Sequence, residues 1–197
     1  MRKLRAGVLI SGRGSNMMSL IEAARAQEYP VEIRCVVSNR PDAKGLEHAV
    51  SQDIATKVID HQAYASRETF DAELGRYLAS QSLDLVACAG FMRFLGPALV
   101  AEWRGRMLNI HPSLLPAYPG VRTHERAIAD GVKVHGCTVH QVTADLDGGP
   151  IILQTQVPVL PGDTPETLAA RVLKEEHRIY PKALAMVARE LQAKTST

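Results

Sequence analysis

The chain has 197 residues, of which 46% are hydrophobic and 22% are charged, and its formal net charge at pH 7 is +2. This length predicts one domain over residues 1–197, and the weak charge argues against nucleic acids or membranes as partners. No apolar run is long enough to span a bilayer. The cysteines Cys35, Cys88 and Cys137 lie in apolar runs without paired spacing. They predict buried reduced thiols in a cytoplasmic protein and no metal centre.

Apolar runs alternate with helical patterns through the first half of the chain. The apolar runs predict strands at 4–10, 31–38, 56–60, 84–90 and 106–110. Apolar residues at helical spacing predict helices at 16–27, 42–52 and 66–80. This alternation is typical of right-handed βαβ units. It predicts an α/β fold in which a Rossmann-like, mostly parallel, twisted sheet is flanked by helices.

The second half of the chain has a different pattern. Two runs at 134–143 and 150–159 predict an antiparallel strand pair, joined by the polar connection ADLDGGP. His140 alternates within the first of these strands, so we expect it to have a structural partner. A helix is predicted from about Pro165, with Pro181 starting a final segment.

The stretch SGRGSNM joins the first predicted strand to the first predicted helix. Gly12 and Gly14 allow a tight turn and close approach of a ligand, and the free N–H groups at a helix start favour an anion. Met17 stands where a dinucleotide fingerprint needs a small residue, and no lysine precedes Ser15 as in a nucleoside triphosphate loop. The pattern therefore favours a monophosphate. The alternative is a plain tight turn in which Ser15 or Asn16 caps the helix.

The stretch LNIHPSLLPAYPG ends the fifth predicted strand. Strand alternation places Asn109 and His111 on one face, and ligands of open α/β sheets bind at the carboxyl ends of strands. These two side chains could hold an oxygen that becomes negative during a reaction. Pro112 and Pro116 restrict the loop that follows. The alternative is a histidine with a structural partner beside a turn-forming asparagine.

Three carboxylates complete the set of candidate residues. Asp145 and Asp147 precede two glycines, and a carboxylate near an imidazole would stabilise its charged form and orient it. A simple Asp-Gly-Gly turn is the alternative. Glu176 falls on the apolar stripe of the last helix, where it needs a partner such as a ligand hydroxyl or amine, unless the stripe ends there and the carboxylate is solvated.

In this order, the segments closely resemble the phosphoribosylglycinamide formyltransferases (glycinamide ribonucleotide transformylases), a family of the formyltransferase superfamily. ISGRGSNM resembles the phosphate loop of that family, AGFMRFL its folate-pocket segment and EEHRIYP a substrate contact. NIHPSLLPAYPG and HQVTADLDGGPII resemble its catalytic segments. The resemblance covers nearly the whole chain, and no motif position departs from the family pattern.

The resemblance implies transfer of the formyl group of 10-formyltetrahydrofolate to the amine of glycinamide ribonucleotide in de novo purine biosynthesis. The reaction would pass through a tetrahedral intermediate, without a metal, with Asn109, His111 and Asp147 as the catalytic residues. The ribonucleotide would be bound by Gly12, Gly14, Ser15, Asn16, Leu173, Lys174, Glu175 and Glu176. The folate would be bound by Arg67, Met92, Arg93, Phe94, Leu95, Asn109, Thr143, Ala144, Asp145, Leu146 and Asp147. We expect a monomer or a weak homodimer.

Three other functions share part of this pattern. A formyltetrahydrofolate deformylase resembles the same catalytic core but uses water as the nucleophile, and normally carries an extra N-terminal domain. A methionyl-tRNA formyltransferase would need a C-terminal RNA-binding domain and more positive charge. A non-catalytic phosphoribosyl- or folate-binding module would keep the glycine loop without needing Asn109, His111 and Asp147 together.

Overall fold

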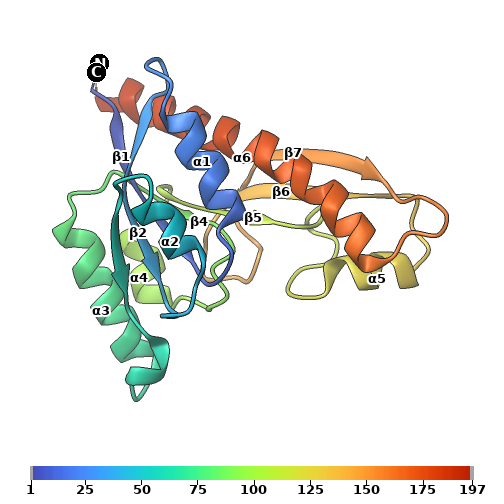
Figure 1. Ribbon diagram of the computed structural model, residues 1–197, viewed down its shortest axis with the longest axis horizontal. Coiled ribbons are helices and arrows are strands. Elements are labelled where there is room, and N and C mark those ends of the chain that lie inside the picture. The colour runs from blue at the N-terminus through green and yellow to red at the C-terminus, as the bar shows by residue number, and fades with distance from the viewer. Residues whose placement is uncertain (1, 196–197) are drawn as a thin grey trace.

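The computed structural model describes residues 2–195, and within them seven strands form a single sheet (Figure 1). The order of the strands across the sheet is β3-β2-β1-β4-β5-β6-β7. Pairs from β3 to β5 are parallel, whereas β5–β6 and β6–β7 are antiparallel. The fold is therefore the predicted α/β fold with an antiparallel C-terminal pair. The strands are β1 Leu4–Ile10, β2 Val31–Ser38, β3 Ala55–Val58, β4 Leu85–Cys88, β5 Met107–His111, β6 Val134–Gln141 and β7 Ile151–Pro158.

Helices cover both faces of this sheet, and each face has its own apolar core. The side chains of α1, α2 and α6 pack on one face, and those of α3 and α4 pack on the other. Figure 1 shows α1 and α6 side by side, in agreement with the contacts between them. The helices are α1 Ser15–Ala24, α2 Gly45–Val50, α3 Arg67–Ser80, α4 Pro97–Glu102, α5 Thr123–Ala129 and α6 Pro165–Thr195, with a 3-10 turn at His61–Ala63.

The residues of β1 show how the sequence produces two cores. Val8 and Ile10 are fully buried against the α1 and α6 side, while Leu9 between them is fully buried against the α3 side. Successive side chains of a strand point to opposite faces, so a strand covered on both faces has to be apolar at every position. The short helices α4 and α5 were not predicted. The first supplies the crossover between the parallel strands β4 and β5 that the topology requires.

Helix α6 is continuous, which corrects the prediction that Pro181 starts a separate final segment. A proline inside a helix costs about 3 kcal/mol because it removes a backbone hydrogen bond and clashes with the preceding turn. Ile179 and Tyr180 before Pro181, and Leu184 after it, are almost completely buried. Each such side chain contributes about 1.5–3 kcal/mol by burial, so packing on both sides of the proline outweighs its cost.

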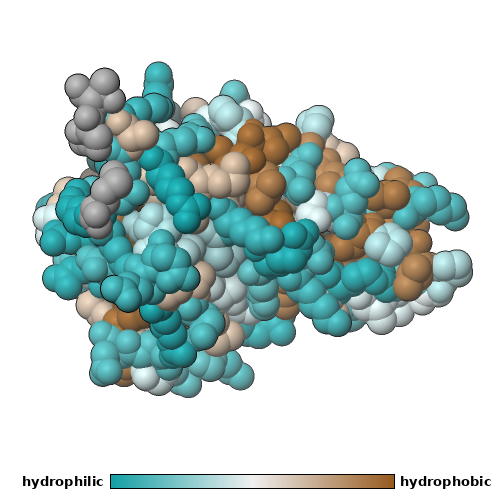
Figure 2. Space-filling model, turned by 90° about the horizontal axis from the view of Figure 1, so that it is seen from above, coloured by the Kyte–Doolittle hydropathy of each residue, from teal (hydrophilic) through white to brown (hydrophobic). Residues whose placement is uncertain are grey.

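The surface formed by α6 and β7 is more apolar than the surface near the two ends of the chain. Seen from above, apolar side chains gather toward the half of the molecule away from those ends (Figure 2). Ile151 on β7, Leu160 after it and Met186 on α6 are exposed apolar residues. Strand β7 forms the edge of the sheet there.

The glycine-rich turn after β1 is packed closely against the start of α2, and this contact gives a stability test. Gly14 has a φ of +74°, and a Cβ there would lie 2.9 Å from the Cα of Gly45. We expect Gly14→Ala to lower the free energy of unfolding by about 1–3 kcal/mol. Gly12→Ala is the matched control, because a Cβ at Gly12 meets no atom within 4 Å. Urea unfolding should separate the two variants, and equal stabilities would contradict this packing argument.

Candidate active site at the carboxyl ends of β4 and β5

A cavity of about 550 Å³ lies where β4 and β5 end. Its wall brings together predicted residues from five separate segments of the chain. These are Asn16, Met92, Arg93, Phe94, Leu95, Asn109, His111, Thr143, Asp145, Leu146, Asp147 and Glu176. The wall also contains residues that the sequence analysis did not single out for the site, namely Cys88, Gly90, Phe91, Ile110, Pro112, Gly120, Val121, Arg122, Thr123, His124, His140 and Val142.

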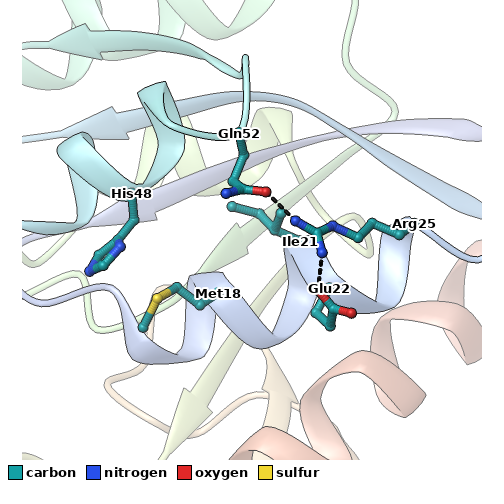
Figure 3. A pocket seen from close by; sticks show the side chains of 6 residues that line it. All are labelled: Met18, Ile21, Glu22, Arg25, His48 and Gln52. Carbon is teal, nitrogen blue, oxygen red and sulfur yellow. Dashed lines mark hydrogen bonds and ion pairs between the residues drawn. The ribbon is translucent and has the colours of Figure 1, made fainter.

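A second hollow of about 160 Å³ lies between α1 and α2 (Figure 3). On its polar rim, Arg25 bonds to the side-chain oxygen of Gln52 and lies 2.7 Å from the carboxylate of Glu22. Met18 and Ile21 supply its apolar wall. No predicted site residue lines this hollow, so the larger cavity is the candidate active site.

Asn109 is held by a neighbour on the next strand. The antiparallel register of β5 and β6 places His140 directly opposite Asn109, and the Asn109 amide nitrogen lies 3.2 Å from His140 Nε2. His140 Nδ1 donates to the carbonyl of Gln141 at 2.9 Å. Burial lowers the pKa of His140, which keeps the ring neutral near pH 7 with Nε2 free to accept. His140 therefore fixes the Asn109 amide with its nitrogen toward the ring, and leaves its second N–H available.

The ring of His111 lies between two oxygen atoms. Its Nε2 donates to the carbonyl of Tyr118 at 2.9 Å, and its Nδ1 lies 3.4 Å from Oδ2 of Asp147. A carbonyl can only accept, so Nε2 carries a hydrogen in this geometry. Any proton gained or lost by this ring then resides on Nδ1, facing Asp147. The side chains of His111 and Asp147 are only 6% and 9% exposed, so little water competes for them.

Asp147 is positioned by the backbone around it. The residue has a φ of +51°, and its Oδ2 accepts the Gly120 N–H at 2.8 Å. Its Oδ1 lies 3.6 Å from Nε2 of His140, so one carboxylate faces both histidines. Gly149 lets the chain return to β6, since a Cβ there would lie 1.8 Å from the carbonyl oxygen of Gln141. The glycines after Asp147 thus serve close backbone packing as well as a turn.

The loop after His111 is held by buried hydroxyl groups. Ser113 Oγ donates to the carbonyl of Ala117 at 2.6 Å, and Thr138 Oγ1 donates to the carbonyl of Ser113 at 2.7 Å. Gln154 reaches the same network through Thr138 and the carbonyl of Leu115. The prolines limit the conformations of this loop, and these hydrogen bonds fix it against β6 and β7.

The glycine-rich turn opens α1 without a side-chain cap, because Gly14 occupies the cap position. The alternative in which Ser15 or Asn16 caps the helix is therefore wrong. Asn16 instead donates its amide N–H to Oε2 of Glu176 at 2.7 Å, and both residues are buried. The Asn16 amide oxygen has no hydrogen-bond partner among the described residues.

Glu176 is buried on the apolar stripe and has a partner, as one of the two readings of the sequence predicted. Burial raises the pKa of its carboxyl, and the hydrogen bond from Asn16 lowers that pKa in part. Asn16 and Glu176 both line the cavity, and the unpartnered amide oxygen of Asn16 is buried there. This pair is suited to hydroxyl or amine donors of a ligand.

Residues 91–95 form another wall, and two side chains from elsewhere hold the backbone of this segment and of the residue that follows it. Ser11 Oγ accepts the Met92 N–H at 2.7 Å, and Asp71 accepts the Gly96 N–H at 2.6 Å. The Arg67 guanidinium lies 5.4 Å from the centre of the Phe94 ring. This wall is therefore largely backbone and apolar surface, as in most small-molecule pockets.

Some predicted residues do not line the cavity. Glu175 illustrates the reason, because it faces another side of α6 and bonds to Arg178 and Thr155. Lys174 on the same helix is exposed. The predicted residues that lie off the wall are Gly12, Gly14, Ser15, Arg67, Ala144, Leu173, Lys174 and Glu175.

Three further properties of residues 2–195 bear on the function. In this part of the chain, no three His, Cys, Asp or Glu side chains are arranged to hold a metal ion. Within the same residues, none of the helices combines the length and hydropathy needed to cross a bilayer. The three cysteines are buried free thiols.

Comparison with known proteins identifies relatives over nearly the whole chain. Residues 4–184 match the family model described as formyl transferase. The phosphoribosylglycinamide formyltransferase of Escherichia coli (strain K12) is 48% identical over 181 residues, which are 92% of this chain and 85% of that protein. The trifunctional purine biosynthetic protein adenosine-3 of Drosophila melanogaster is also 48% identical, over 94% of this chain. The match spans only 14% of that longer protein.

Solved structures show the same likeness in three dimensions. The crystal structure of phosphoribosylglycinamide formyltransferase from Brucella melitensis superimposes with a TM-score of 0.91 at 49% sequence identity. The match covers 95% of this chain and 96% of that one.

Buried neutral histidines around the cavity predict sensitivity to acid. Burial and the neighbouring His124 lower the pKa of His135 to about 4. The pKa of His135 in the folded state lies below its pKa in the unfolded chain, so the unfolded chain takes up a proton first. As the pH falls from about 7 to about 5, this lowers the free energy of unfolding by about 2 kcal/mol. His135→Phe keeps an aromatic ring against Tyr118 and His124 but cannot be protonated. Urea unfolding at both pH values should show a smaller acid-induced loss in this variant; an unchanged loss would exclude His135 as a cause.

Proposed function

Because the chain belongs to the formyl transferase family, we propose that it transfers the formyl group of 10-formyltetrahydrofolate to the amine of glycinamide ribonucleotide. The reaction serves purine biosynthesis, as the names of its relatives indicate for those proteins. One observation carries the proposal. Asn109, His111 and Asp147 meet on the wall of one cavity whose other walls come from Asn16 and Glu176 and from the segments 91–95 and 142–147.

Asn109 is the proposed donor to the oxygen that becomes negative when the amine attacks the formyl carbon. One of its two amide hydrogens is directed to His140, so the other can point at the substrate without first reorienting. Such preorganised donors act mainly on the transition state, since the substrate oxygen gains charge only as the tetrahedral intermediate forms.

His111 and Asp147 are the proposed proton-handling pair. The hydrogen on Nε2 is committed to the Tyr118 carbonyl, so the Nδ1 position facing Asp147 is the one that can take or give a proton. The 3.4 Å separation is longer than a good hydrogen bond, which leaves this contact open to replacement by substrate or water.

The ribonucleotide is proposed to extend from the start of α1 to Asn109. The uncapped N–H groups there suit its phosphate, with Gly12, Gly14 and Ser15 forming the turn. Asn16 and Glu176 lie between this turn and the catalytic residues, and the Glu176 carboxylate suits the ribose hydroxyls. Leu173, Lys174 and Glu175 remain predicted contacts that lie off the cavity wall.

The folate is proposed to lie against the other two walls. Met92, Arg93, Phe94 and Leu95 form one of them, and Thr143, Asp145, Leu146 and Asp147 form the other. Arg67 and Ala144, off the wall, would contact the outer parts of the molecule. The proposal also includes one domain over residues 1–197, a cytoplasmic location and a monomer or weak homodimer, for which the buried free thiols support the location.

The direct test is to mix the purified protein with 10-formyltetrahydrofolate and follow formation of tetrahydrofolate, with and without glycinamide ribonucleotide. We expect turnover only when the ribonucleotide is present. Turnover without it would indicate a deformylase, and binding of both compounds without turnover would indicate a non-catalytic module.

The role of Asn109 predicts a specific kinetic effect. Loss of one oxyanion donor typically lowers turnover by about 10²–10³-fold, so Asn109→Ala should lower kcat by that factor. KM for either substrate should change far less, because the bond strengthens mainly in the transition state. Asn109→Asp should be no better, since a carboxylate repels the oxyanion. A variant that melts earlier but keeps near-normal kcat would refute the catalytic role.

The phosphate assignment predicts selective loss of ribonucleotide binding. Gly12→Val adds bulk at the glycine-rich turn without meeting neighbouring atoms at its Cβ, so the fold should survive. We expect ribonucleotide affinity to fall by more than about tenfold, or about 1.4 kcal/mol, while folate affinity stays nearly unchanged. Calorimetric titration of each ligand measures this difference, and equal losses for both would count against the assignment.

A further inference from the structure

The backbone of residues 118–122, called here the 118–122 loop, touches both members of the proposed proton-handling pair. The carbonyl of Tyr118 accepts from His111 Nε2 at 2.9 Å, and the N–H of Gly120 donates to Asp147 Oδ2 at 2.8 Å. Both contacts come from the main chain. The conformation of the loop, rather than any of its side chains, therefore sets the geometry of the pair.

This conformation is unfavourable for the residues that adopt it. Tyr118 and Arg122 have φ values of +55° and +57°, in the left-handed region that side chains with a Cβ disfavour, and Gly120 has a φ of +77°. A loop with such angles keeps its shape only if other groups hold it. Besides the contacts with His111 and Asp147, Ser113 Oγ donates to the Tyr118 carbonyl at 3.2 Å, and the Tyr118 hydroxyl donates to Asp130 at 3.0 Å.

Arg126, on α5, contacts this loop in three places. Its Nη1 donates to the carbonyl of Pro119 at 2.7 Å and lies 3.4 Å from the carbonyl of Val121. Its guanidinium lies over the ring of Tyr118, 5.3 Å from the ring centre. The two carbonyls flank Gly120, and the ring belongs to the residue whose carbonyl holds His111. Both hydrogen bonds of the Arg126 guanidinium come from Nη1 and end on carbonyls of the loop.

We infer that Arg126 is a positioning residue that holds the 118–122 loop so that its backbone fixes His111 and Asp147. The inference rests on the proposed formyl transfer. A guanidinium suits this task because its planar fork offers several donors at fixed angles and its face can stack on an aromatic ring. Arg126 itself contacts neither catalytic side chain; it acts through the carbonyl of Tyr118 and the N–H of Gly120.

Substitution by methionine and by lysine separates the donors of Arg126 from its packing. Arg126→Met keeps an unbranched apolar side chain but has no donors, and Arg126→Lys keeps one charged donor group without the planar fork. We expect kcat to fall about tenfold in Arg126→Met and less in Arg126→Lys, with KM for both substrates within about threefold of wild type. Arg104→Ala, which removes an exposed arginine elsewhere, is the matched control and should leave kcat unchanged.

A spectroscopic measurement tests the inference without turnover. In nitrogen-15 spectra of the intact protein, the His111 Nε2–H signal should shift or broaden in Arg126→Met and recover in part in Arg126→Lys. Wild-type kcat and an unchanged His111 signal in Arg126→Met would overturn the inference. A raised KM for folate with unchanged kcat would also overturn it, since Arg126 would then be a ligand contact. If the wild type lacks formyl transfer altogether, the proposed function fails while the His111 signal still tests the loop.

Discussion

The geometry of the site depends on the contacts that the carboxylate of Asp147 makes. It lies near His111 and His140 and accepts a backbone N–H from Gly120, in surroundings where its side chain is 9% exposed. A buried carboxylate needs a hydrogen-bond donor such as the Gly120 N–H, because burial without one would cost several kcal/mol. The end of the ADLDGGP connection, the 118–122 loop and the ends of β5 and β6 therefore meet around this carboxylate.

The change from parallel to antiparallel pairing at β5 explains why this point lies where it does. Strands β1, β4 and β5 end at the same edge of the sheet, which brings the glycine-rich turn, segment 91–95 and Asn109 together. Because β6 runs back along β5, His140 stands opposite Asn109. Helix α6 then crosses this half of the sheet and places Glu176 beside Asn16.

Sequence patterns predicted the strands and the position of Asn109 and His111 on one face of a strand end. Strand alternation and the proline-rich loop are local signals, so they can be recognised in the sequence. They predicted a structural partner for His140 but not that it would be Asn109, since the register between β5 and β6 depends on tertiary packing. Tyr118 and Gly120 act through backbone atoms, which leave no residue-type signal. Pro181 was misread because the proline signal is local, whereas the burial that keeps α6 continuous comes from the rest of the fold.

The claim that His111 exchanges its proton on Nδ1, opposite Asp147, can be measured directly. Nitrogen-15 chemical shifts of both ring nitrogens, recorded over a series of pH values, report which one carries a hydrogen at each pH. The account predicts that Nε2 keeps its hydrogen throughout, because the Tyr118 carbonyl accepts it, and that only Nδ1 is deprotonated. Loss of the hydrogen from Nε2, with Nδ1 still protonated, would contradict it.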